Sequence, residues 1–157
     1  MFFRPVEKKD LTIVLALIKE LATHERRPDA VVASVQDLES ILFSPHPIGY
    51  GLVAERDGHI VGYALLAIKF SSFRGKPVLY IEDVYIQQKA RGKGAGFSFM
   101  QEISRFAQHK NCIAMEWSAL DFNEIAITFY EKMGAELETG RVHFDGDSEF
   151  IKRISDA

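Results

Sequence analysis

The stretch that decides the fold is Gln88-Lys89-Ala90-Arg91-Gly92-Lys93-Gly94-Ala95-Gly96-Phe97. It lies between an apolar run that is typical of a strand and an amphipathic run that is typical of a helix. Its alternating glycines permit unusual backbone angles and a close approach of another group to the main chain. Successive backbone amides at the start of a helix form a seat with partial positive charge. The stretch therefore predicts a site for a phosphate-bearing ligand.

Two familiar phosphate-binding patterns do not fit this loop. In a Walker loop the positions of Gln87 and Gly94 would hold a glycine and a Ser or Thr. In the dinucleotide pattern the last glycine would fall on Phe97 or Phe99. A glycine-rich surface turn is the structural alternative, but three small residues at a helix start lower stability unless close approach requires them.

The composition is that of an ordinary globular protein. The 157 residues are 47% hydrophobic and 26% charged, which is enough for a real core. The formal charge of −3 gives no overall attraction for nucleic acid or an anionic membrane, so we expect neither partner. We expect the single cysteine, Cys112, to be buried as a small hydrophobic residue. One cysteine cannot form a disulfide within the chain, which indicates a reducing compartment. Without a signal-peptide pattern or a membrane-length apolar run, we expect a cytoplasmic protein.

Strand and helix patterns alternate along the chain, which indicates one α/β domain over residues 1–157. Helical spacing covers residues 11–22, 34–43, 94–109 and 123–133, and strand patterns cover 2–6, 50–55, 60–68, 78–86 and 113–117. Asp57-Gly58 predicts a tight hairpin turn, and residues 135–154 are expected to form another hairpin that turns near Asp145-Gly146-Asp147. The result is a mixed central sheet of about six to seven strands flanked by about four helices.

Two segments resemble the GCN5-related N-acetyltransferase (GNAT) superfamily, whose cofactor is acetyl-CoA. One runs from Glu82-Asp83-Val84-Tyr85-Ile86 through Arg91-x-x-Gly94-x-Gly96. In the other, Asn123 precedes a helix that carries Phe129-Tyr130 and ends at Gly134-Ala135. Leu17-Ile18-Lys19-Glu20-Leu21-Ala22-x-x-Glu25 is similar to the diamine branch, which includes the spermidine/spermine and thialysine N-acetyltransferases. The resemblance covers nearly the whole chain and implies a GNAT fold and a homodimer, although past Gly134 the chain is shorter than those relatives.

The resemblance implies acetyl transfer from acetyl-CoA to a primary amine of a diamine, a polyamine or a lysine-like amino acid. Only a neutral amine attacks a thioester, and an alkylamine with a pKa near 10.4 is neutral in about one molecule per thousand at pH 7.4, a cost of roughly 4 kcal/mol. Glu82 lies in an otherwise apolar strand, so we expect it to anchor the amine or take its proton, with its basicity raised by burial. A bulge, as the family has at this strand, would bring Asp83 toward the same channel. Without the resemblance, a solvent-facing acidic pair is the favoured interpretation.

By position Tyr130 matches the family's general acid. A tyrosine with a pKa near 10 keeps its proton at neutral pH and can donate it to the departing CoA thiolate. A backbone N–H at Val84 or Tyr85 is expected to stabilise the oxyanion. The structural alternative for Tyr130 is a core tyrosine on an amphipathic helix.

The remaining site residues are also implied by the resemblance. The backbone of strand residues is expected to bind pantetheine, the loop amides the pyrophosphate, and Lys132 a phosphate. The predicted cofactor-binding set is Val84, Tyr85, Ile86, Arg91, Gly92, Lys93, Gly94, Ala95, Gly96, Phe97, Asn123, Ala126, Tyr130 and Lys132. The predicted substrate-binding set is His24, Glu25, Glu82 and Asp83, with His24 at a position where the branch usually has tyrosine. No metal is expected, because the five histidines are scattered and no second histidine follows His24 at zinc-motif spacing.

Two other function classes remain open. A non-catalytic acyl-CoA-binding module would keep the glycine loop but would need neither Glu82 nor Tyr130. A protein or peptide N-acetyltransferase would need a peptide groove and a lower concentration of acidic side chains.

Overall fold

The structure is a computed structural model that describes residues 1–157. The chain forms two compact units, Met1–Asp121 and Phe122–Ala157. The single domain over residues 1–157 therefore stays a prediction.

The N-terminal unit alternates strands with helices, as the sequence predicts. Its elements are β1 (Phe2–Pro5), η1 (Lys8–Asp10), α1 (Leu11–His24), η2 (Pro28–Ala30), α2 (Val35–Phe43), β2 (Tyr50–Arg56), β3 (His59–Ser71), β4 (Lys76–Ile86), η3 (Gln88–Ala90), α3 (Ala95–His109) and β5 (Met115–Trp117). The C-terminal unit contains α4 (Glu124–Lys132) and α5 (Ser148–Ser155). None of these helices combines the length and the apolar character that crossing a membrane requires.

The sheet is mixed and has five strands in the order β1-β2-β3-β4-β5. The first four strands are antiparallel to their neighbours, and β5 alone runs parallel to β4. The α/β class and the mixed sheet are confirmed. The strand number is lower than expected, and there are five α-helices instead of about four.

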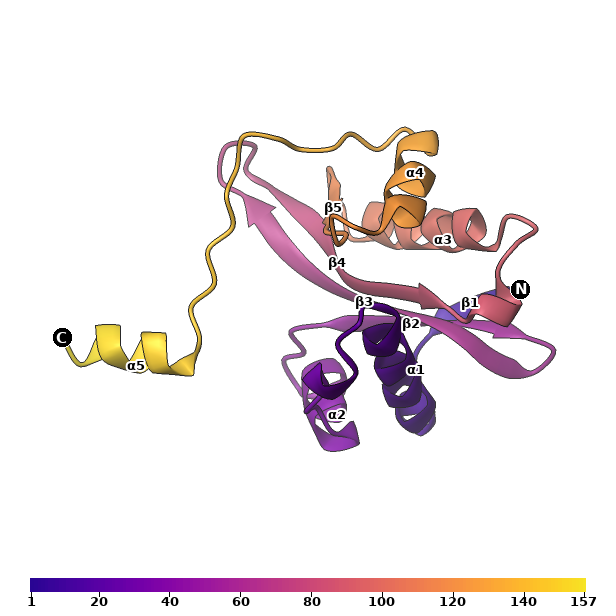
Figure 1. The fold of residues 1–157 in the computed structure, drawn as a ribbon, viewed down its shortest axis with the longest axis horizontal. Helices are drawn as coiled ribbons and strands as arrows, with labels where there is room; N and C mark the ends of the chain where they lie inside the picture. The colour runs from indigo at the N-terminus through magenta and orange to yellow at the C-terminus, as the bar shows by residue number, and fades with distance from the viewer. The chain divides into compact units, whose positions relative to one another are not determined.

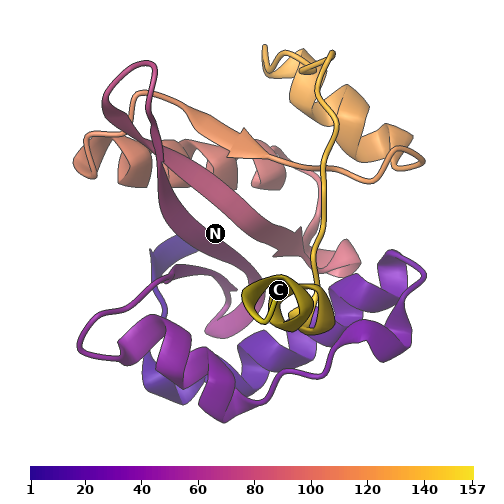
Figure 2. The ribbon, with the colours of Figure 1, turned by 90° about the vertical axis from the view of Figure 1, so that its left-hand side faces the viewer.

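Helices cover both faces of the sheet in the N-terminal unit. Figure 1 shows α1 and α2 on one face and α3 on the other, and Figure 2 shows β3 and β4 crossing between these layers. On the first face a buried cluster joins α1 and α2 to the sheet; it contains Leu11, Val14, Leu17, Leu38, Val53, Tyr63 and Tyr85. On the other face Phe99 and Ile103 of α3 are fully buried, and Phe3 stacks on Phe99 at 5.0 Å between ring centroids. This packing places the sheet between two layers of helices.

Local signals explain where several elements begin and turn. Asp57 and Gly58 both have positive φ, at 52° and 78°, which is the geometry that joins β2 to β3 with the right twist. Ser34 begins α2 through a capping box with Asp37. Cys112 follows α3 and is only partly buried, so the expectation of a buried cysteine is wrong, although partial burial still raises the pKa of its thiol.

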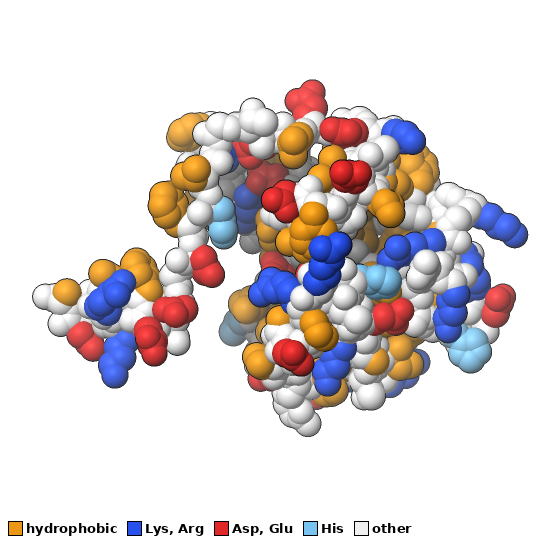
Figure 3. Space-filling model, in the orientation of Figure 1, with side chains coloured by type: hydrophobic (Ala, Val, Ile, Leu, Met, Phe, Trp, Pro, Cys, Tyr) orange, Lys and Arg blue, Asp and Glu red, His pale blue; other side chains and the backbone are white.

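The C-terminal unit differs from the sequence prediction. The expected hairpin over residues 135–154 is wrong, because residues 148–155 form α5. The side chain of Asp147 accepts a hydrogen bond from the Phe150 N–H at 2.8 Å and so caps the helix where a turn was expected. Phe150, Ile151 and Ile154 follow helical spacing instead of strand alternation. Figure 3 shows side chains of both charges beside apolar ones on this helix.

Candidate functional site

A bulge interrupts β4 at Glu82. Asp83 pairs with Leu65 of β3 and Ile81 pairs with Leu66, so Glu82 is the extra residue and has no partner. Such a bulge bends a strand and redirects the side chains around it. The bulge that the resemblance implied is therefore present at the acidic pair.

The sheet opens beside the bulge. β5 pairs with β4 only from Leu79 to Ile81, so β4 continues past the last paired residue. The Gln87 N–H donates to the Val61 carbonyl of β3 at 2.9 Å. Amides alternate in direction along an antiparallel strand, so the Tyr85 N–H also faces β3, whereas those of Val84 and Ile86 face the open edge. Of the two amides predicted to stabilise an oxyanion, this geometry favours Val84.

The glycine loop that follows β4 has the geometry of an anion seat. Gly92, Lys93 and Gly94 all have positive φ, at 86°, 49° and 77°, and the Ala95 N–H closes the turn on the Gly92 carbonyl at 3.0 Å. Gly94 is the N-cap of α3, and the first turn of α3 has no acidic residue. The amides of Gly96 and Phe97 lie in that first turn, where helical N–H groups have no partner within the helix. A Cβ added at Gly92 or Gly94 would meet no protein atom within 4 Å, which leaves room for a diphosphate.

A hydrogen-bond network connects α1 with the end of β4. Glu20 accepts one hydrogen bond from the Tyr85 hydroxyl at 2.9 Å and another from the Gln87 amide at 2.8 Å. Arg91 donates through Nε to the Ile86 carbonyl at 2.8 Å, and its guanidinium lies 5.4 Å from the centroid of the Tyr85 ring. These contacts fix the start of the glycine loop against the sheet. The Gln87 hydrogen bond in particular lowers the pKa of Glu20.

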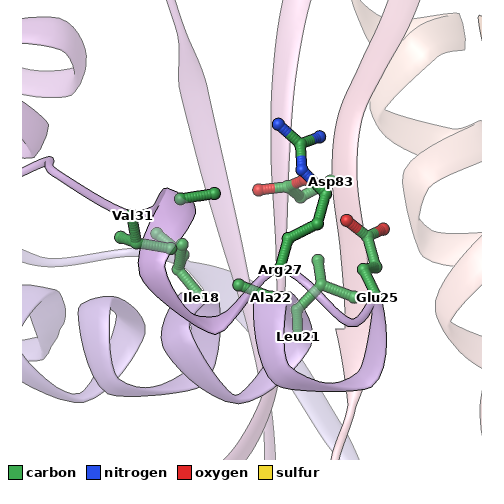
Figure 4. Close-up of a pocket in the computed structure, with 8 residues that line it drawn as sticks. Ile18, Leu21, Ala22, Glu25, Arg27, Val31 and Asp83 are labelled. Carbon is green, nitrogen blue, oxygen red and sulfur yellow. The ribbon is translucent and has the colours of Figure 1, made fainter.

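A pocket of about 150 Å³ lies between the end of α1, η2 and the bulged part of β4. Figure 4 shows the charged ends of Glu25, Arg27 and Asp83 gathered above the end of α1. The residues that line it are Ile18, Leu21, Ala22, Glu25, Arg27, Ala30, Val31 and Asp83. The pocket therefore brings together two of the predicted substrate residues, Glu25 and Asp83, which are 58 positions apart in the sequence.

Asp83 is the unusual titrating group of this pocket. Burial raises its pKa to about 6, and the negative charges of Glu82 and Glu25 act in the same direction. The Tyr63 hydroxyl donates to Asp83 at 3.2 Å and partly opposes this effect. Burial, with the nearby Asp83 charge, also raises the pKa of Tyr63, which therefore stays a proton donor. A carboxylate with a pKa near 6 holds a proton more readily than an ordinary aspartate.

Two details of the predicted substrate site differ from expectation. Glu82 is exposed, so the expected burial of its carboxylate is wrong. The bulge leaves Glu82 exposed and places Asp83 in the pocket beside α1. Asp83, and not Glu82, is therefore the acid of the pair whose carboxylate is partly buried. Neither Glu82 nor His24 lines the pocket, and the His24 ring instead lies 5.6 Å from that of Tyr85.

The other predicted site residues lie in the C-terminal unit. Asn123 caps α4, because its side-chain oxygen accepts the Ala126 N–H at 3.2 Å. Tyr130 lies on α4 beside Phe129, with 5.3 Å between the ring centroids, and burial raises the pKa of Tyr130. Lys132 is the last residue of α4, and Gly134 follows with φ of 88°, which is typical of a helix C-terminus. The predicted roles of these residues in binding and catalysis stay predictions.

Sequence reasoning missed three residues around the site. Arg27 belongs to what the sequence presents as a solvated helix end. Glu20 has no predicted role beyond its place in the segment that is similar to the diamine branch, and Tyr63 has none beyond its place in the strand pattern over residues 60–68. Their roles depend on how α1 packs against β3 and β4, and no local pattern specifies that packing. The one available signal is that Glu20 and His24 are four residues apart and therefore share a face of α1.

Comparison with known proteins agrees with this geometry. Residues 15–135 match the acetyltransferase (GNAT) family. The chain is 30% identical over 144 residues to a thialysine N-epsilon-acetyltransferase of Bos taurus, which covers 87% of this chain and 84% of that protein. It is 33% identical over 139 residues to a spermidine/spermine N(1)-acetyltransferase-like protein 1 of Homo sapiens, covering 84% of this chain and 20% of that protein. An integron cassette protein from the mobile metagenome of V. cholerae has a similar structure, with a TM-score of 0.81, 25% identity and coverage of 99% and 98% of the two chains. The chain belongs to the GNAT acetyltransferase family and is an enzyme of that family.

Proposed function

We propose that this enzyme transfers the acetyl group of acetyl-CoA to a primary amine of a small cationic substrate: a diamine, a polyamine or a lysine-like amino acid. The observation that carries the proposal is the bulge at Glu82, which places two adjacent carboxylates at the point where β4 and β5 separate. The pocket beside it, whose lining includes Glu25 and Asp83, suits a cation, and the glycine loop beyond it suits a diphosphate. The similarity to a thialysine N-epsilon-acetyltransferase and to a spermidine/spermine N(1)-acetyltransferase-like protein supports the same substrate class.

The two carboxylates would hold and deprotonate the amine. Asp83 lines the pocket and Glu82 precedes it on the bulge, where the negative charge of Glu82 already acts on Asp83. An ammonium group beside Asp83 would therefore be attracted by both charges. We propose Glu82 as the base or amine anchor, directly or through water, with Asp83 as the partly buried partner that keeps the amine in place. The raised pKa of Asp83, about 6, favours proton sharing with an amine at neutral pH.

The neutral amine nitrogen then attacks the thioester carbonyl carbon. A C–N bond forms, the C–S bond breaks, and the proton lost by nitrogen passes to the carboxylate pair. The Val84 N–H faces the open edge of β4 and would donate to the carbonyl oxygen as negative charge develops on it. Tyr130 would protonate the departing thiolate, and burial keeps its hydroxyl protonated over a wider pH range.

The cofactor proposal yields a prediction for Gly94→Ala. Alanine at a φ of 77° is strained by about 1–2 kcal/mol, so the loop will relax and move the amides that bind the diphosphate. We expect the affinity for acetyl-CoA, measured by calorimetry, to fall by about tenfold or more.

Gly75→Ala is the matched control for this loop. Gly75 also has a positive φ, 60°, and a Cβ added there would also meet open space. It lies in the turn before β4, whereas the glycine loop follows the other end of this strand. We expect Gly75→Ala to lower stability similarly and to leave the affinity unchanged. Equal affinities for a well-folded Gly94→Ala and the wild type would contradict the diphosphate seat.

The function itself is tested by release of free CoA thiol from acetyl-CoA in the presence of diamines, polyamines, lysine analogues and short peptides. We expect release with small amines, and competition between a diamine and a peptide distinguishes a peptide acetyltransferase. Binding of acetyl-CoA without release for any amine would indicate an acyl-CoA-binding module instead. The homodimer stays a prediction, and it is tested by measuring the molecular mass of the protein in solution.

A further inference from the structure

The pocket that contains Asp83 also contains a cation that a plain diamine would not need. Arg27 lines the pocket together with Glu25 and Asp83. The Arg27 guanidinium is exposed and forms no ion pair with either acid, so it is available to a ligand. Figure 4 shows it directed to the same space as the two carboxylates.

The backbone of Arg27 is fixed while its side chain is not. The Arg27 N–H donates to the Ala22 carbonyl at 2.8 Å, and the Arg27 carbonyl accepts the Ala30 N–H at 3.0 Å. The preceding residue, Arg26, has a φ of 60° and turns the chain sharply at the end of α1. The turn therefore fixes the backbone of Arg27 beside the pocket, which its side chain lines.

The charges of the pocket match an amino acid better than a diamine. Glu25 and Asp83 with Arg27 present two negative charges and one positive charge. A diamine places two ammonium groups among them, one of which is repelled by Arg27. A lysine-like amino acid carries two ammonium groups and one carboxylate, which is the complementary set. Arginine binds a carboxylate through two parallel hydrogen bonds, so this match also has a preferred geometry.

We propose that Arg27 is a specificity-determining residue that binds the carboxylate of the acceptor, so that lysine-like and ornithine-like amino acids are preferred over diamines and polyamines. Glu25, which lines the same pocket, binds the α-ammonium group, and the methylene chain lies on Ile18, Leu21 and Ala22. The side-chain amine then reaches Asp83 beside the bulge. This assignment rests on the proposed acetylation of an amine.

The test compares the binding of three compounds: L-lysine, L-lysinamide and cadaverine. L-lysinamide has nearly the size of L-lysine but a neutral amide in place of the carboxylate, and cadaverine has a hydrogen atom there. Calorimetric titration in the presence of CoA measures binding independently of turnover. We expect the wild type to bind L-lysine about tenfold or more tightly than either analogue. Arg27→Gln should abolish this preference, and Arg27→Lys should keep only part of it, because lysine lacks the planar fork.

Arg26→Gln is the matched control, since it removes one positive charge from the adjacent position, which does not line the pocket. We expect it to retain the preference for L-lysine. A wild type that binds lysinamide or cadaverine as tightly as lysine overturns the inference. So does an Arg27→Gln variant that still binds acetyl-CoA and retains the full preference.

Thiol release with the same three compounds separates this inference from the proposed function. Tight binding of L-lysine through Arg27 without any release of CoA would refute amine acetylation and leave the carboxylate site standing. Equal acetylation of L-lysine and cadaverine by the wild type and by Arg27→Gln would support acetylation and refute the role of Arg27.

Discussion

Replacing Tyr130 with phenylalanine is expected to lower kcat by about one to three orders of magnitude while the affinity for acetyl-CoA stays nearly unchanged. The substitution removes only the hydroxyl and keeps the ring that packs beside Phe129. Without that hydroxyl, the thiolate leaves without a proton donor. Steady-state kinetics with saturating amine and calorimetry with acetyl-CoA measure the two quantities separately.

The chemistry of the leaving group provides a sharper form of this test. An acetyl donor with a more acidic leaving group needs less help from an acid, so Tyr130→Phe should impair its reaction less than that of acetyl-CoA. Tyr50→Phe is a suitable control, because Tyr50 packs against Phe106 and Lys110 in the N-terminal unit. An unchanged kcat for Tyr130→Phe would remove this residue from the mechanism. A parallel fall in acetyl-CoA affinity would make it a binding residue instead.

Replacing Asp83 with asparagine is expected to change activity and stability in opposite directions. Loss of the charge that holds the amine should lower kcat/KM by about two orders of magnitude. In the wild type, activity should fall as the pH drops through about 6, because Asp83 takes up a proton there. This acidic limb of the pH profile should be absent from Asp83→Asn, whose residual activity we measure between pH 5 and 8.

The stability effect follows from the direction of the same shift. The pKa of Asp83 is raised from 3.8 to about 6 in the folded state, so between these values the folded protein binds more protons than the unfolded one. The contribution of Asp83 to the free energy of unfolding therefore falls as the pH rises from 4 to 6, by at most about 3 kcal/mol. Asparagine still accepts the Tyr63 hydrogen bond but carries no charge, so Asp83→Asn should be more stable than the wild type at pH 7.

Urea unfolding of both proteins at pH 4.5 and pH 7 measures this effect. Glu39→Gln provides the control, because this exposed carboxylate pairs with Lys8 on the surface and should change stability by less than about 0.5 kcal/mol. If Asp83→Asn is less stable than the wild type at pH 7, the buried carboxylate is paired more favourably than the Tyr63 contact alone suggests.

Much of the N-terminal unit was predictable from local signals. The Asp57-Gly58 turn and the glycine loop before α3 depend on backbone angles that few residues adopt, and the start of α2 depends on the side chain of Ser34 as a cap, so the residue types reveal them. The C-terminal segment was not predictable in the same way. A short run with Phe150, Ile151 and Ile154 fits a strand or a helix, and the Asp147 cap decides for the helix.

The sequence by itself determined the location of the glycine loop, the predicted anion seat, and of the acidic pair, because glycines at a helix start and charges in an apolar strand stand out without knowledge of the fold. Only the tertiary structure decided which acid of the pair is partly buried and which is exposed, and which residues surround them. The bulge at Glu82 depends on the register with β3, and the pocket forms because the end of α1 packs against β4. Register and packing join residues far apart in the chain, so no single stretch contains the information that places Arg27 and Glu25 beside Asp83.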